Sequence, residues 1–354
     1  MYDVIIVGAG PAGATLARMI GNRYKVLLVD KRFDPGAEFS REKCCGGLLA
    51  PDAQKILGKM GVALPREILV GPQIFKVRAI DLQAGLEKYY QRFYINLDRA
   101  KFDRWLVSMV PPAVETRFGR RLTGIEYGDK CRVHLYGEKG TETIEGKVLV
   151  GADGAYSMVR RKLFPFAVEP HRYLALQEWF PADKMLPYYS AIFEPSITDF
   201  YSWIIPKERF LILGSALSPG KNVSQNFLKL KKQLGNYGFN LGESVKQESA
   251  ALLRPGGSRE IQTGSGQAVL IGEAAGLISP SSAEGLSYAF VSALLASKAL
   301  SGGLHDPATR YHRMTASLRR NINRKRIKSA IIYYAPTRRA IMASGFSTIK
   351  LESF

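Results

Sequence analysis

A chain of 354 residues can bury a large core, and typical domain sizes predict two or three lobes. Its 34 glycines favour many tight turns over a helical bundle, and so indicate an α/β fold. The formal charge of +19 predicts an anionic partner. The three cysteines, Cys44, Cys45 and Cys131, match neither a disulfide framework nor a zinc pattern, so we expect no metal site.

The N-terminal segment lacks the features of an export signal. Met1 leads directly into the apolar stretch Val4 to Val7, without a basic region or a cleavage site, so we expect a cytoplasmic protein. A membrane-spanning helix needs about 20 apolar residues. The best stretch, Ser287 to Leu300, is shorter and contains Lys298, so any membrane contact should be peripheral, on the inner face.

The first twenty residues predict a strand, a glycine turn and a helix in direct succession. The strand is Tyr2 to Val7, the helix is Ala14 to Ile20, and the turn between them reads Gly8-Ala9-Gly10-Pro11-Ala12-Gly13. Gly8 permits the tight turn, Gly10 lets the backbone approach a pyrophosphate, and Gly13 allows close packing of helix on strand. The helix N-terminus then faces the negative charge of a dinucleotide.

A second predicted strand, Tyr24 to Val29, ends in an acid. Asp30 lies seventeen residues after Gly13, where a carboxylate that binds a ribose hydroxyl is expected, and we include its neighbour Lys31 in the predicted cofactor site. The alternative is a glycine-rich turn of an unrelated α/β protein. An acid at this position also disfavours a 2′-phosphorylated nucleotide.

Two later segments repeat the pattern of a strand that ends in a polar glycine turn. Val148 to Gly154 is followed by Ser157 and the basic pair Arg160 and Arg161. Ala268 to Gly276 contains Gly272-Glu273-Ala274-Ala275-Gly276, and a long helix is predicted from Gly285 to Leu300.

Together these segments resemble the three nucleotide motifs of the flavoprotein superfamily that contains p-hydroxybenzoate hydroxylase, flavin halogenases and geranylgeranyl reductases. The resemblance implies FAD as the cofactor. It assigns Ala152, Asp153 and Gly154 to the pyrophosphate side, and Glu273 to the place of an Asp that contacts the ribityl chain. Arg99, which opens the predicted helix Arg99 to Val107, matches a family arginine that reaches the cofactor phosphates, although an exposed surface arginine is an alternative.

Cys45-Gly46-Gly47 resembles a Cys-Gly-Gly that the geranylgeranyl reductases carry beside the isoalloxazine. A thiol at this place could donate a proton, gate movement of the ring or pack as a small hydrophobe. The resemblance makes Cys45 a catalytic candidate and adds Gly46 and Gly47 to the cofactor site; a buried structural cysteine is the alternative. Within this branch the chain also resembles the bacterial CbrA-type proteins, which share the Gly-Glu-Ala-Ala-Gly and Cys-Gly-Gly sequences.

Tyr201-Ser202-Trp203-Ile204-Ile205-Pro206 resembles the reductase pattern Tyr-x-Trp-x-Phe-Pro and overlaps the halogenase pattern Trp-x-Trp-x-Ile-Pro; the Cys-Gly-Gly favours the reductases. On a strand, Tyr201, Trp203 and Ile205 share one face and form an aromatic wall, which makes Tyr201 and Trp203 catalytic candidates, with core packing as the alternative. The stretch Ile278 to Gly285 resembles the family's proline-containing loop. It places Gly272, Gly276 and Gly285 near the flavin.

The predicted fold class is α/β: a Rossmann-like FAD-binding domain, similar to p-hydroxybenzoate hydroxylase, with an inserted antiparallel sheet and a C-terminal helical segment. Residues 1–70, 96–165 and 264–302 form the discontinuous FAD-binding domain, residues 73–95 and 170–263 the substrate-binding cap, and residues 303–354 the basic helical region. Strands are expected at Tyr188 to Phe193, Phe200 to Ile205 and Phe210 to Ala216. Their aromatic and aliphatic side chains suit an apolar small molecule or lipid as substrate.

The segment Arg310 to Arg339 contains ten Lys or Arg and no acid. Apolar residues recur in it at helical intervals: Met314, Leu318, Ile322, Ile327 and Ile331. This pattern predicts a basic amphipathic helix that docks on anionic phospholipid, or else a helix that packs its apolar side on the body. No nucleic-acid-binding module accompanies the charge, so we expect no nucleic acid partner.

The leading hypothesis is an FAD-dependent oxidoreductase that reduces carbon–carbon double bonds of an isoprenoid lipid of the geranylgeranyl type by hydride transfer. NAD(P)H or an iron–sulfur protein would supply the electrons. One alternative is a flavin monooxygenase or halogenase that acts on an apolar or aromatic substrate. Another is a non-catalytic, membrane-associated flavin-binding redox protein.

Overall fold

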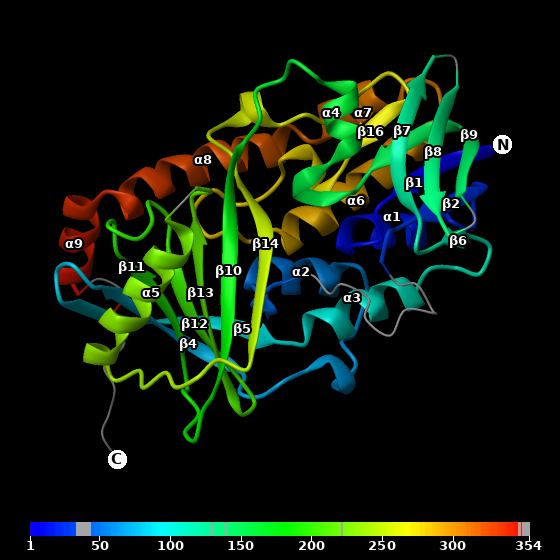
Figure 1. Ribbon diagram of the computed structural model, residues 1–354. Helices are drawn as coiled ribbons and strands as arrows, with labels where there is room; N and C mark the ends of the chain where they lie inside the picture. The colour runs from blue at the N-terminus through cyan, green and yellow to red at the C-terminus, as the bar shows by residue number, and fades with distance from the viewer. Residues whose placement is uncertain (33–43, 129, 139, 221, 346–347, 349–354) are drawn as a thin grey trace.

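The structure is a computed structural model that describes residues 1–32, 44–128, 130–138, 140–220, 222–345 and 348. In this part of the chain the strands form two eight-stranded sheets. The sheet that contains β1 and β9 lies at one end of the molecule, and the sheet that contains β4 and β11 lies at the other (Figure 1).

The first sheet has a parallel centre. Its strands, in spatial order, are β15 (Gly264–Ser265), β16 (Ala268–Leu270), β9 (Gly140–Gly151), β1 (Tyr2–Val7), β2 (Val26–Val29) and β6 (Glu115–Arg117). The antiparallel strands β8 (Cys131–Gly137) and β7 (Arg121–Tyr127) extend it beside the first half of β9. The pairs from β16 through β9, β1 and β2 to β6 are all parallel, as a Rossmann-like sheet requires.

The second sheet is mainly antiparallel. Its strands, in spatial order, are β14 (Lys246–Arg254), β10 (His171–Pro181), β13 (Phe210–Leu217), β12 (Ser202–Lys207), β11 (Tyr189–Phe193), β4 (Ile74–Asp81), β5 (Leu86–Asn96) and β3 (Leu48–Leu49). β4 and β11 pair in parallel. The fold class predicted from the sequence, an FAD-binding α/β unit with an inserted sheet and C-terminal helices, is confirmed.

Helices connect and cover the sheets. They are α1 (Pro11–Ile20), α2 (Pro51–Lys59), α3 (Arg99–Ser108), α4 (Met158–Leu163), α5 (Val223–Leu234), α6 (Leu286–Ser301), α7 (Pro307–Met314), α8 (Ala316–Tyr333) and α9 (Ala335–Ala343). Short 3₁₀ turns lie at Arg66–Ile68, Gly154–Tyr156, Gly235–Tyr237, Ser258–Glu260 and Gly272–Ala275. Among the helices of the described residues, none has the length and apolar character of a transmembrane span.

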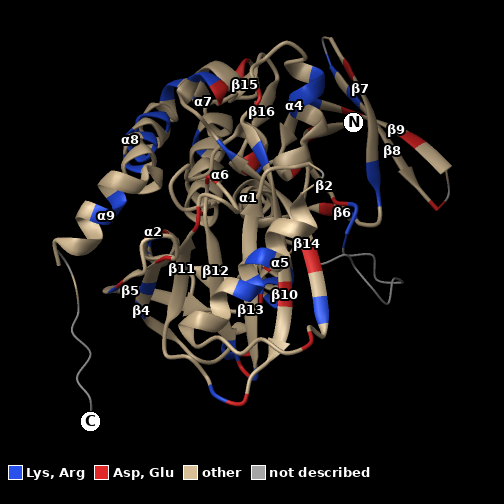
Figure 2. Ribbon diagram, turned by 60° about the vertical axis from the view of Figure 1, so that its left-hand side comes forward, with Lys and Arg blue, Asp and Glu red and all other residues tan. Residues whose placement is uncertain are grey.

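The C-terminal helices run from one sheet to the other. α7 contacts β15 and β16 of the first sheet, and α9 contacts β5 of the second. Lys and Arg recur along α8 and α9, which lie at the edge of the molecule in Figure 2. The predicted single helix from Arg310 to Arg339 is wrong, because the chain turns at Thr315 and again at Tyr334. Pro336 explains the second turn, since its ring lacks an N–H and would clash with the Ile332 carbonyl in a continuous helix.

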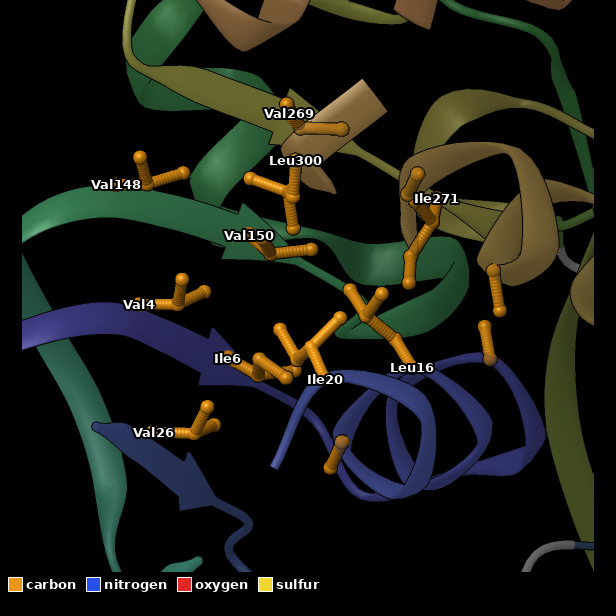
Figure 3. Close-up of a cluster of buried hydrophobic side chains, with 14 of the residues drawn as sticks. Val4, Ile6, Leu16, Ile20, Val26, Val148, Val150, Val269, Ile271 and Leu300 are labelled. Atoms are coloured by element: carbon orange, nitrogen blue, oxygen red, sulfur yellow. The ribbon is translucent and has the colours of Figure 1, made fainter. Parts of the chain in front are cut away.

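Strand β1 is buried on both faces, which explains its almost entirely apolar sequence. Val4 and Ile6 pack with α1 and α6 in one cluster, and Ile5 and Val7 point into a second cluster on the opposite face. Figure 3 shows the first cluster, in which valines of β2, β9 and β16 meet Leu16 and other residues of α1 and α6. Complete burial of one such side chain stabilises the fold by roughly 1.5 to 3 kcal/mol.

Several strand boundaries differ from the prediction by one or two residues, and β12 differs at both ends. β12 covers Ser202–Lys207 rather than Phe200 to Ile205, so Phe200 and Tyr201 precede the strand. Thr198 and Asp199 account for the shift, because the Thr198 hydroxyl accepts a hydrogen bond from the Phe200 backbone N–H and donates one to the Ala216 carbonyl. These bonds hold the segment before β12 in a turn.

A buried ion pair fastens α9 to the second sheet, and this contact predicts a difference between two adjacent arginines. Arg338 Nε lies 2.8 Å from Asp81 Oδ2, with side chains 4% and 0% exposed, and Arg338 also donates to the Ile332 and Tyr333 carbonyls freed by the helix break. Arg339 lies 3.7 Å from the same carboxylate and is 38% exposed. We expect Arg338→Met to lower the free energy of unfolding by about 3 kcal/mol and Arg339→Met by less than about 1 kcal/mol.

Denaturant titration of the two variants beside the natural protein measures this difference. Equal losses in both variants would contradict a dominant role for the buried pair.

Candidate active site

The motif residues meet because four parallel strands end level with one another. Val7 of β1 pairs with Val29 of β2 and with Gly151 of β9, and Gly151 pairs with Leu270 of β16. The residues that follow these strands begin the motifs predicted from the sequence: Gly8, Asp30, Ala152 and, after Ile271, Gly272. One edge of the first sheet therefore carries all three nucleotide motifs.

The first glycine turn lies so close to its neighbours that side chains would not fit. Gly8 has a φ of +106°, and a Cβ there would lie 2.4 Å from the Ala152 carbonyl oxygen. A Cβ on Gly13 would lie 1.8 Å from the Gly8 carbonyl oxygen. At Gly10 the nearest atom to a Cβ is Arg32 Nη2 at 3.7 Å, so this glycine borders open space at the N-terminus of α1, which Pro11 and Ala12 begin. This arrangement fits a pyrophosphate group against Gly10.

Asp30 lies beside this turn. Its Oδ2 accepts a hydrogen bond of 2.7 Å from the Ala9 backbone N–H, and its Oδ1 accepts one of 2.8 Å from the Arg32 backbone N–H. The guanidinium of Arg32 also binds the carboxylate, with Nε 3.2 Å from Oδ1. Lys31, which we predicted as part of the cofactor site, is exposed, and Arg32 is the cation that contacts Asp30.

Ion pairs continue from Asp30 towards the second sheet. Arg32 Nη1 lies 3.4 Å from Asp103 Oδ2, and Arg99 Nε lies 2.7 Å from Asp103 Oδ1. Arg99 is buried, so the alternative of a surface arginine is wrong. Burial opposes its charge, but the Asp103 carboxylate and the Cys45 thiol outweigh burial and hold the pKa of Arg99 above its usual value. Arg99, the last of the charged residues that begin with Asp30, thus contacts Cys45.

The structure brings together two markers that lie about 160 residues apart in the sequence. A Cβ on Gly46 would lie 2.3 Å from Ile205 Cδ1, so the Cys45-Gly46-Gly47 loop packs directly against the face of β12. Gly47 has a φ of +62°, and a Cβ there would lie 2.2 Å from the Leu97 carbonyl oxygen and 2.6 Å from Lys207 Nζ. Lys43, the residue before the two cysteines, lies outside the described residues.

Lys207 is a buried lysine beneath this loop that sequence reasoning missed. Its Nζ donates hydrogen bonds of 2.6 Å to the Leu97 carbonyl and 3.4 Å to the Gly47 carbonyl. Burial lowers the pKa of Lys207 to about 7, although Cys45 and nearby carboxylates favour its charged form. A signal was present in the sequence, because a lysine directly after the apolar run Trp203 to Pro206 is unusual for a buried strand.

Trp203 and Cys44 are joined by one glutamine. The Trp203 indole N–H donates to Gln177 Oε1 at 3.1 Å, and Gln177 Nε2 lies 2.7 Å from Cys44 Sγ. The indole lies over Gly214 on the neighbouring strand, where a Cβ would approach it to 2.3 Å. Burial raises the pKa of Cys44 to about 12, which keeps it a neutral thiol. Cys44 and Trp203 are therefore packed into the sheet, whereas Cys45 is half-buried.

Several tyrosines lie beside Trp203 on this part of the second sheet. Tyr201 stacks obliquely on Trp203 with ring centroids 5.5 Å apart, and its hydroxyl donates to the Ser282 carbonyl at 2.9 Å. Tyr94 and Tyr189 form an edge-to-face pair at 5.8 Å. Burial raises the pKa of Tyr201, and the phenols of Tyr90 and Tyr94 raise it further, so its hydroxyl stays protonated. The predicted aromatic wall is present, and phenol groups give it hydrogen-bonding capacity.

In the second and third motifs the acidic side chains form hydrogen bonds within the protein, and the glycines contribute their backbone. The Asp153 carboxylate accepts hydrogen bonds from the Ser157 hydroxyl and from the Met158 and Val159 backbone N–H groups, so it caps α4. Glu273 Oε1 accepts a bond of 3.2 Å from the Leu253 backbone N–H. The glycines of these motifs contribute backbone: Gly154, Gly272 and Gly276 have positive φ, and Gly285 precedes α6.

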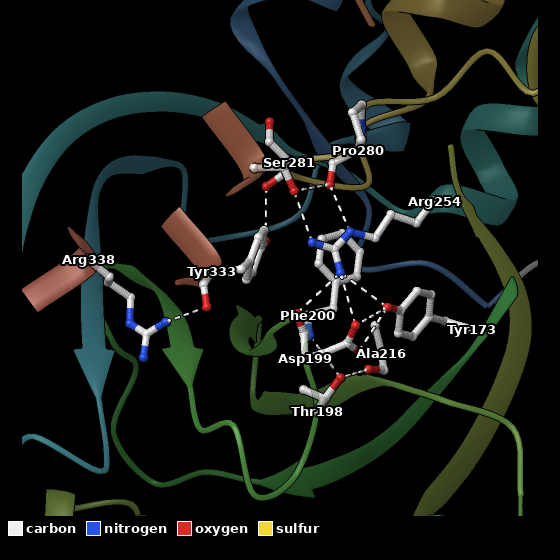
Figure 4. Close-up of polar contacts among 11 residues, drawn as sticks. Tyr173, Thr198, Asp199, Phe200, Ala216, Arg254, Pro280, Ser281, Tyr333 and Arg338 are labelled. Atoms are coloured by element: carbon white, nitrogen blue, oxygen red, sulfur yellow. Dashed lines mark hydrogen bonds and ion pairs between the residues drawn. The ribbon is translucent and has the colours of Figure 1, made fainter. Parts of the chain in front are cut away.

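Arg254 ties the proline-containing loop to both the second sheet and α8 (Figure 4). Its guanidinium donates to the Pro280 carbonyl, the Ser329 hydroxyl and the Tyr173 hydroxyl. It lies over the rings of Phe200 and Tyr333, 4.4 and 4.6 Å from their centroids. The Tyr333 hydroxyl in turn donates to the Ser281 carbonyl at 3.0 Å. This network fixes the loop over the tyrosine-lined face.

A glycine cradle at a helix N-terminus, an acid beside it and an enclosed aromatic face on a second sheet define an FAD-binding oxidoreductase. A family model described as FAD binding domain matches residues 1–232. The chain belongs to this FAD binding domain family, together with the CbrA proteins of enteric bacteria, and FAD is its cofactor.

Similarity to individual proteins extends over almost the whole chain. Protein CbrA of Escherichia coli O6:H1 is 41% identical over 350 residues, which cover 98% of this chain and 94% of CbrA. A geranylgeranyl bacteriochlorophyll reductase-like protein of Thermoplasma acidophilum aligns with a TM-score of 0.78 and 21% identity, covering 94% of this chain and 88% of that one. PqsL of Pseudomonas aeruginosa, a probable FAD-dependent monooxygenase, aligns with a TM-score of 0.71 and 16% identity, covering 98% and 100%.

The two glycines of the first turn should fail in different ways when each is changed to alanine. Gly13→Ala forces a Cβ against the Gly8 carbonyl, so the protein should be destabilised even without FAD. A Cβ on Gly10 would make only an ordinary contact, 3.7 Å from Arg32 Nη2, so the Gly10→Ala apoprotein should keep its stability within about 1 kcal/mol while FAD affinity falls about 100-fold or more. Thermal unfolding of apoprotein and flavin fluorescence titration measure the two effects. Loss of apoprotein stability in Gly10→Ala would contradict the assignment.

Lys207 should make stability rise with pH above neutrality. Its pKa is lowered to about 7 in the folded protein, and an unfolded lysine titrates near about 10.4. Between these values the unfolded chain binds more protons, so the free energy of unfolding rises with pH by up to about 1.4 kcal/mol per unit. In Lys207→Met this contribution is absent, so the stability difference between the variant and the natural protein should change from pH 7 to pH 9. Unfolding midpoints of holoprotein at several pH values test this, and a constant difference would refute it.

Proposed function

We propose that this FAD-dependent oxidoreductase reduces carbon–carbon double bonds of an isoprenoid lipid. The observation that carries the proposal is the contact of Gly46 with Ile205, which puts Cys45 beside the aromatic face of β12. A thiol, a wall of aromatic and aliphatic side chains and a cofactor-binding edge thereby share one site. An unactivated alkene has no hydrogen-bonding groups, so a protein must bind it mainly through such apolar contacts.

FAD held at the glycine turn and beside Asp30 would, in its reduced form, supply the hydride for one alkene carbon and be oxidised, and a proton for the other carbon would come from the protein. The chain's own residues position the alkene, exclude water and supply the proton. Cys45 is the candidate proton donor, because it is half-buried and close to Arg99, Lys207 and Tyr201. These neighbours can stabilise the thiolate that forms when the proton leaves.

The face that receives the substrate also contains phenol groups. Tyr201 keeps its proton because burial raises its pKa, and its hydroxyl donates that proton in a hydrogen bond to the Ser282 carbonyl, which holds the proline-containing loop beside the wall. Trp203 contributes the rigid base of the wall, since its indole is fixed by Gln177 and Gly214. NAD(P)H or an iron–sulfur protein would return electrons to the cofactor between turnovers.

A flavin monooxygenase or halogenase that acts on an apolar or aromatic substrate is the second candidate. The observation that favours it is the Trp203 to Pro206 segment, whose Ile205-Pro206 ending suits the halogenase pattern, on a fold shared with PqsL. The two candidates differ in their need for oxygen. A third, a non-catalytic flavin-binding protein, would bind FAD without turnover of any substrate.

The decisive experiment is anaerobic incubation of dithionite-reduced holoprotein with a geranylgeranyl lipid, with flavin absorbance and product mass followed together. The proposal predicts substrate-dependent reoxidation of the flavin and a gain of about two mass units per turnover. Cys45→Ala should retain FAD and lose about 100-fold or more of the rate, as expected for removal of a proton donor.

Cys44→Ala is the matched control, because Cys44 is the adjacent thiol but is buried and bonded to Gln177. It should keep most of the turnover. Reoxidation that begins only when oxygen is admitted would favour the monooxygenase class, and an unchanged rate in Cys45→Ala would remove this thiol from the mechanism.

A further inference from the structure

Helix α8 has two faces of different character. Its inward face packs on the body through Leu318, Ile322 and Ser329, all of which are buried. These residues follow one another at helical spacing. Arg326 donates to the Gly256 carbonyl, and Lys325 pairs with Asp52 of α2. Leu318 and Ile322, two of the apolar residues that recur at helical intervals in the sequence, therefore pack on the body of the protein.

The other half of the pattern faces away from the body. Ile327, Ile331 and Tyr334 are 61%, 42% and 62% exposed, and Ile341 of α9 is 45% exposed. Ile327 and Ile331 are spaced by four residues, so they form one stripe along the last turns of α8, and the exposed Tyr334 follows directly after the end of the helix. Exposed apolar side chains are common singly, but several of them in one stripe indicate a contact surface.

The same outward stripe begins with arginines. Arg320 and Arg324 precede Ile327 by seven and three residues, so they project on the same side of α8, and both are exposed. Lys328 is also exposed. From Pro307 to Gly345 the chain contains no Asp or Glu. Figure 2 shows the Lys and Arg residues distributed along α8 at the edge of the molecule.

From this surface we infer that the outward face of α8, with Ile341 of α9, docks on a bilayer that contains anionic phospholipid. Cations next to exposed isoleucines and a tyrosine match a membrane interface, where lipid phosphates meet the arginines and the acyl boundary accepts the apolar side chains. A nucleic acid would use the cations but would leave Ile327 and Ile331 in water. An acidic protein would also pair with the arginines, but it would not require a lipid surface.

Docking at this face would bring the membrane close to the candidate active site. Tyr333 lies between Ile331 and Tyr334 in sequence but points inward, where its ring packs on Phe193 and Phe200. Its hydroxyl holds the loop at Ser281. The proposed surface and Tyr333, which packs beside the wall of the site, thus lie on opposite faces of the same helix. The docking proposal does not depend on which reaction the site performs.

The test is co-sedimentation of FAD-loaded protein with vesicles of phosphatidylcholine alone or with about one third phosphatidylglycerol. We expect binding to the anionic vesicles that weakens between about 0.1 M and 1 M salt. Arg320→Glu/Arg324→Glu should reduce the affinity by at least about 25-fold, since each cation near an anionic surface contributes roughly fivefold. Ile327→Glu/Ile331→Glu should reduce it by at least about 10-fold, because the apolar contact is lost.

Matched controls lie on α5 of the second sheet's lobe. Leu228 is 53% exposed and Lys232 is exposed, so Leu228→Glu and Lys232→Glu change an equivalent surface without touching α8. Both should bind vesicles like the natural protein. Retained flavin and an unchanged melting temperature show that each variant is folded.

Three results would overturn the inference: equal binding to neutral and anionic vesicles, no binding to either, or losses that are as large in the α5 variants as in the α8 variants. Competition with RNA adds a fourth. If RNA binds tightly, and Arg320→Glu/Arg324→Glu abolishes that binding while Ile327→Glu/Ile331→Glu leaves vesicle and RNA binding unchanged, the surface recognises nucleic acid instead of lipid. None of these readouts uses enzymatic turnover, so their failure is distinct from failure of the proposed reaction.

Discussion

The site depends on close approach of backbone to backbone at positions where a side chain would not fit. Gly13 against Gly8 brings α1 onto β1, and Gly8 against Ala152 joins the first and second motifs. Gly46 lies equally close to the side chain of Ile205, which brings the cofactor-binding part against the second sheet. Because a Cβ at any of these places would overlap a neighbour by an ångström or more, the distances between motifs are set by the absence of side chains. Polar groups are then placed by the backbone geometry.

A series of ion pairs connects the first glycine turn with the Cys45-Gly46-Gly47 loop. Asp30, Arg32, Asp103 and Arg99 alternate in sign, and each is in contact with the next. Arg99 reaches Cys45, and Lys207 lies beneath the same loop. Buried charges are tolerated where each has a partner, and alternation satisfies this requirement over a long distance. Cys45 at the end of the series thus lies close to Arg99 and Lys207, and cations beside a thiol favour its thiolate form.

Local sequence was sufficient to predict the parts of the site that follow strands. Val7, Val29 and Gly151 end parallel strands, and a glycine or acid directly after such a strand is typical of a dinucleotide site. The shared face of Trp203 and Ile205 was also predictable, because alternation along a strand is a local property, whereas Tyr201 reaches Trp203 from the segment before the strand. Lys207, Arg32 and Gln177 were missed, since each matters through a partner far away in sequence, such as Leu97, Asp103 or Cys44. The break at Tyr334 was missed although Pro336 was visible, because the charge pattern continued across it.

The C-terminal segment shows how one helix serves two requirements. The basic and apolar sequence of this segment was compatible either with docking on a membrane or with packing on the body of the protein. In α8 the residues that pack on the body and the residues that are exposed lie on different faces of the helix. Leu318, Ile322 and Tyr333 bind the body, while Ile327 and Ile331 lie at the surface. Arg254 links Ser329 of this inward face to the Pro280 carbonyl of the proline-containing loop, and Arg338 of the next helix, α9, pairs with Asp81. The helix that presents Ile327 and Ile331 at the surface thus also contacts, through Tyr333, the loop to which Tyr201 donates its hydrogen bond.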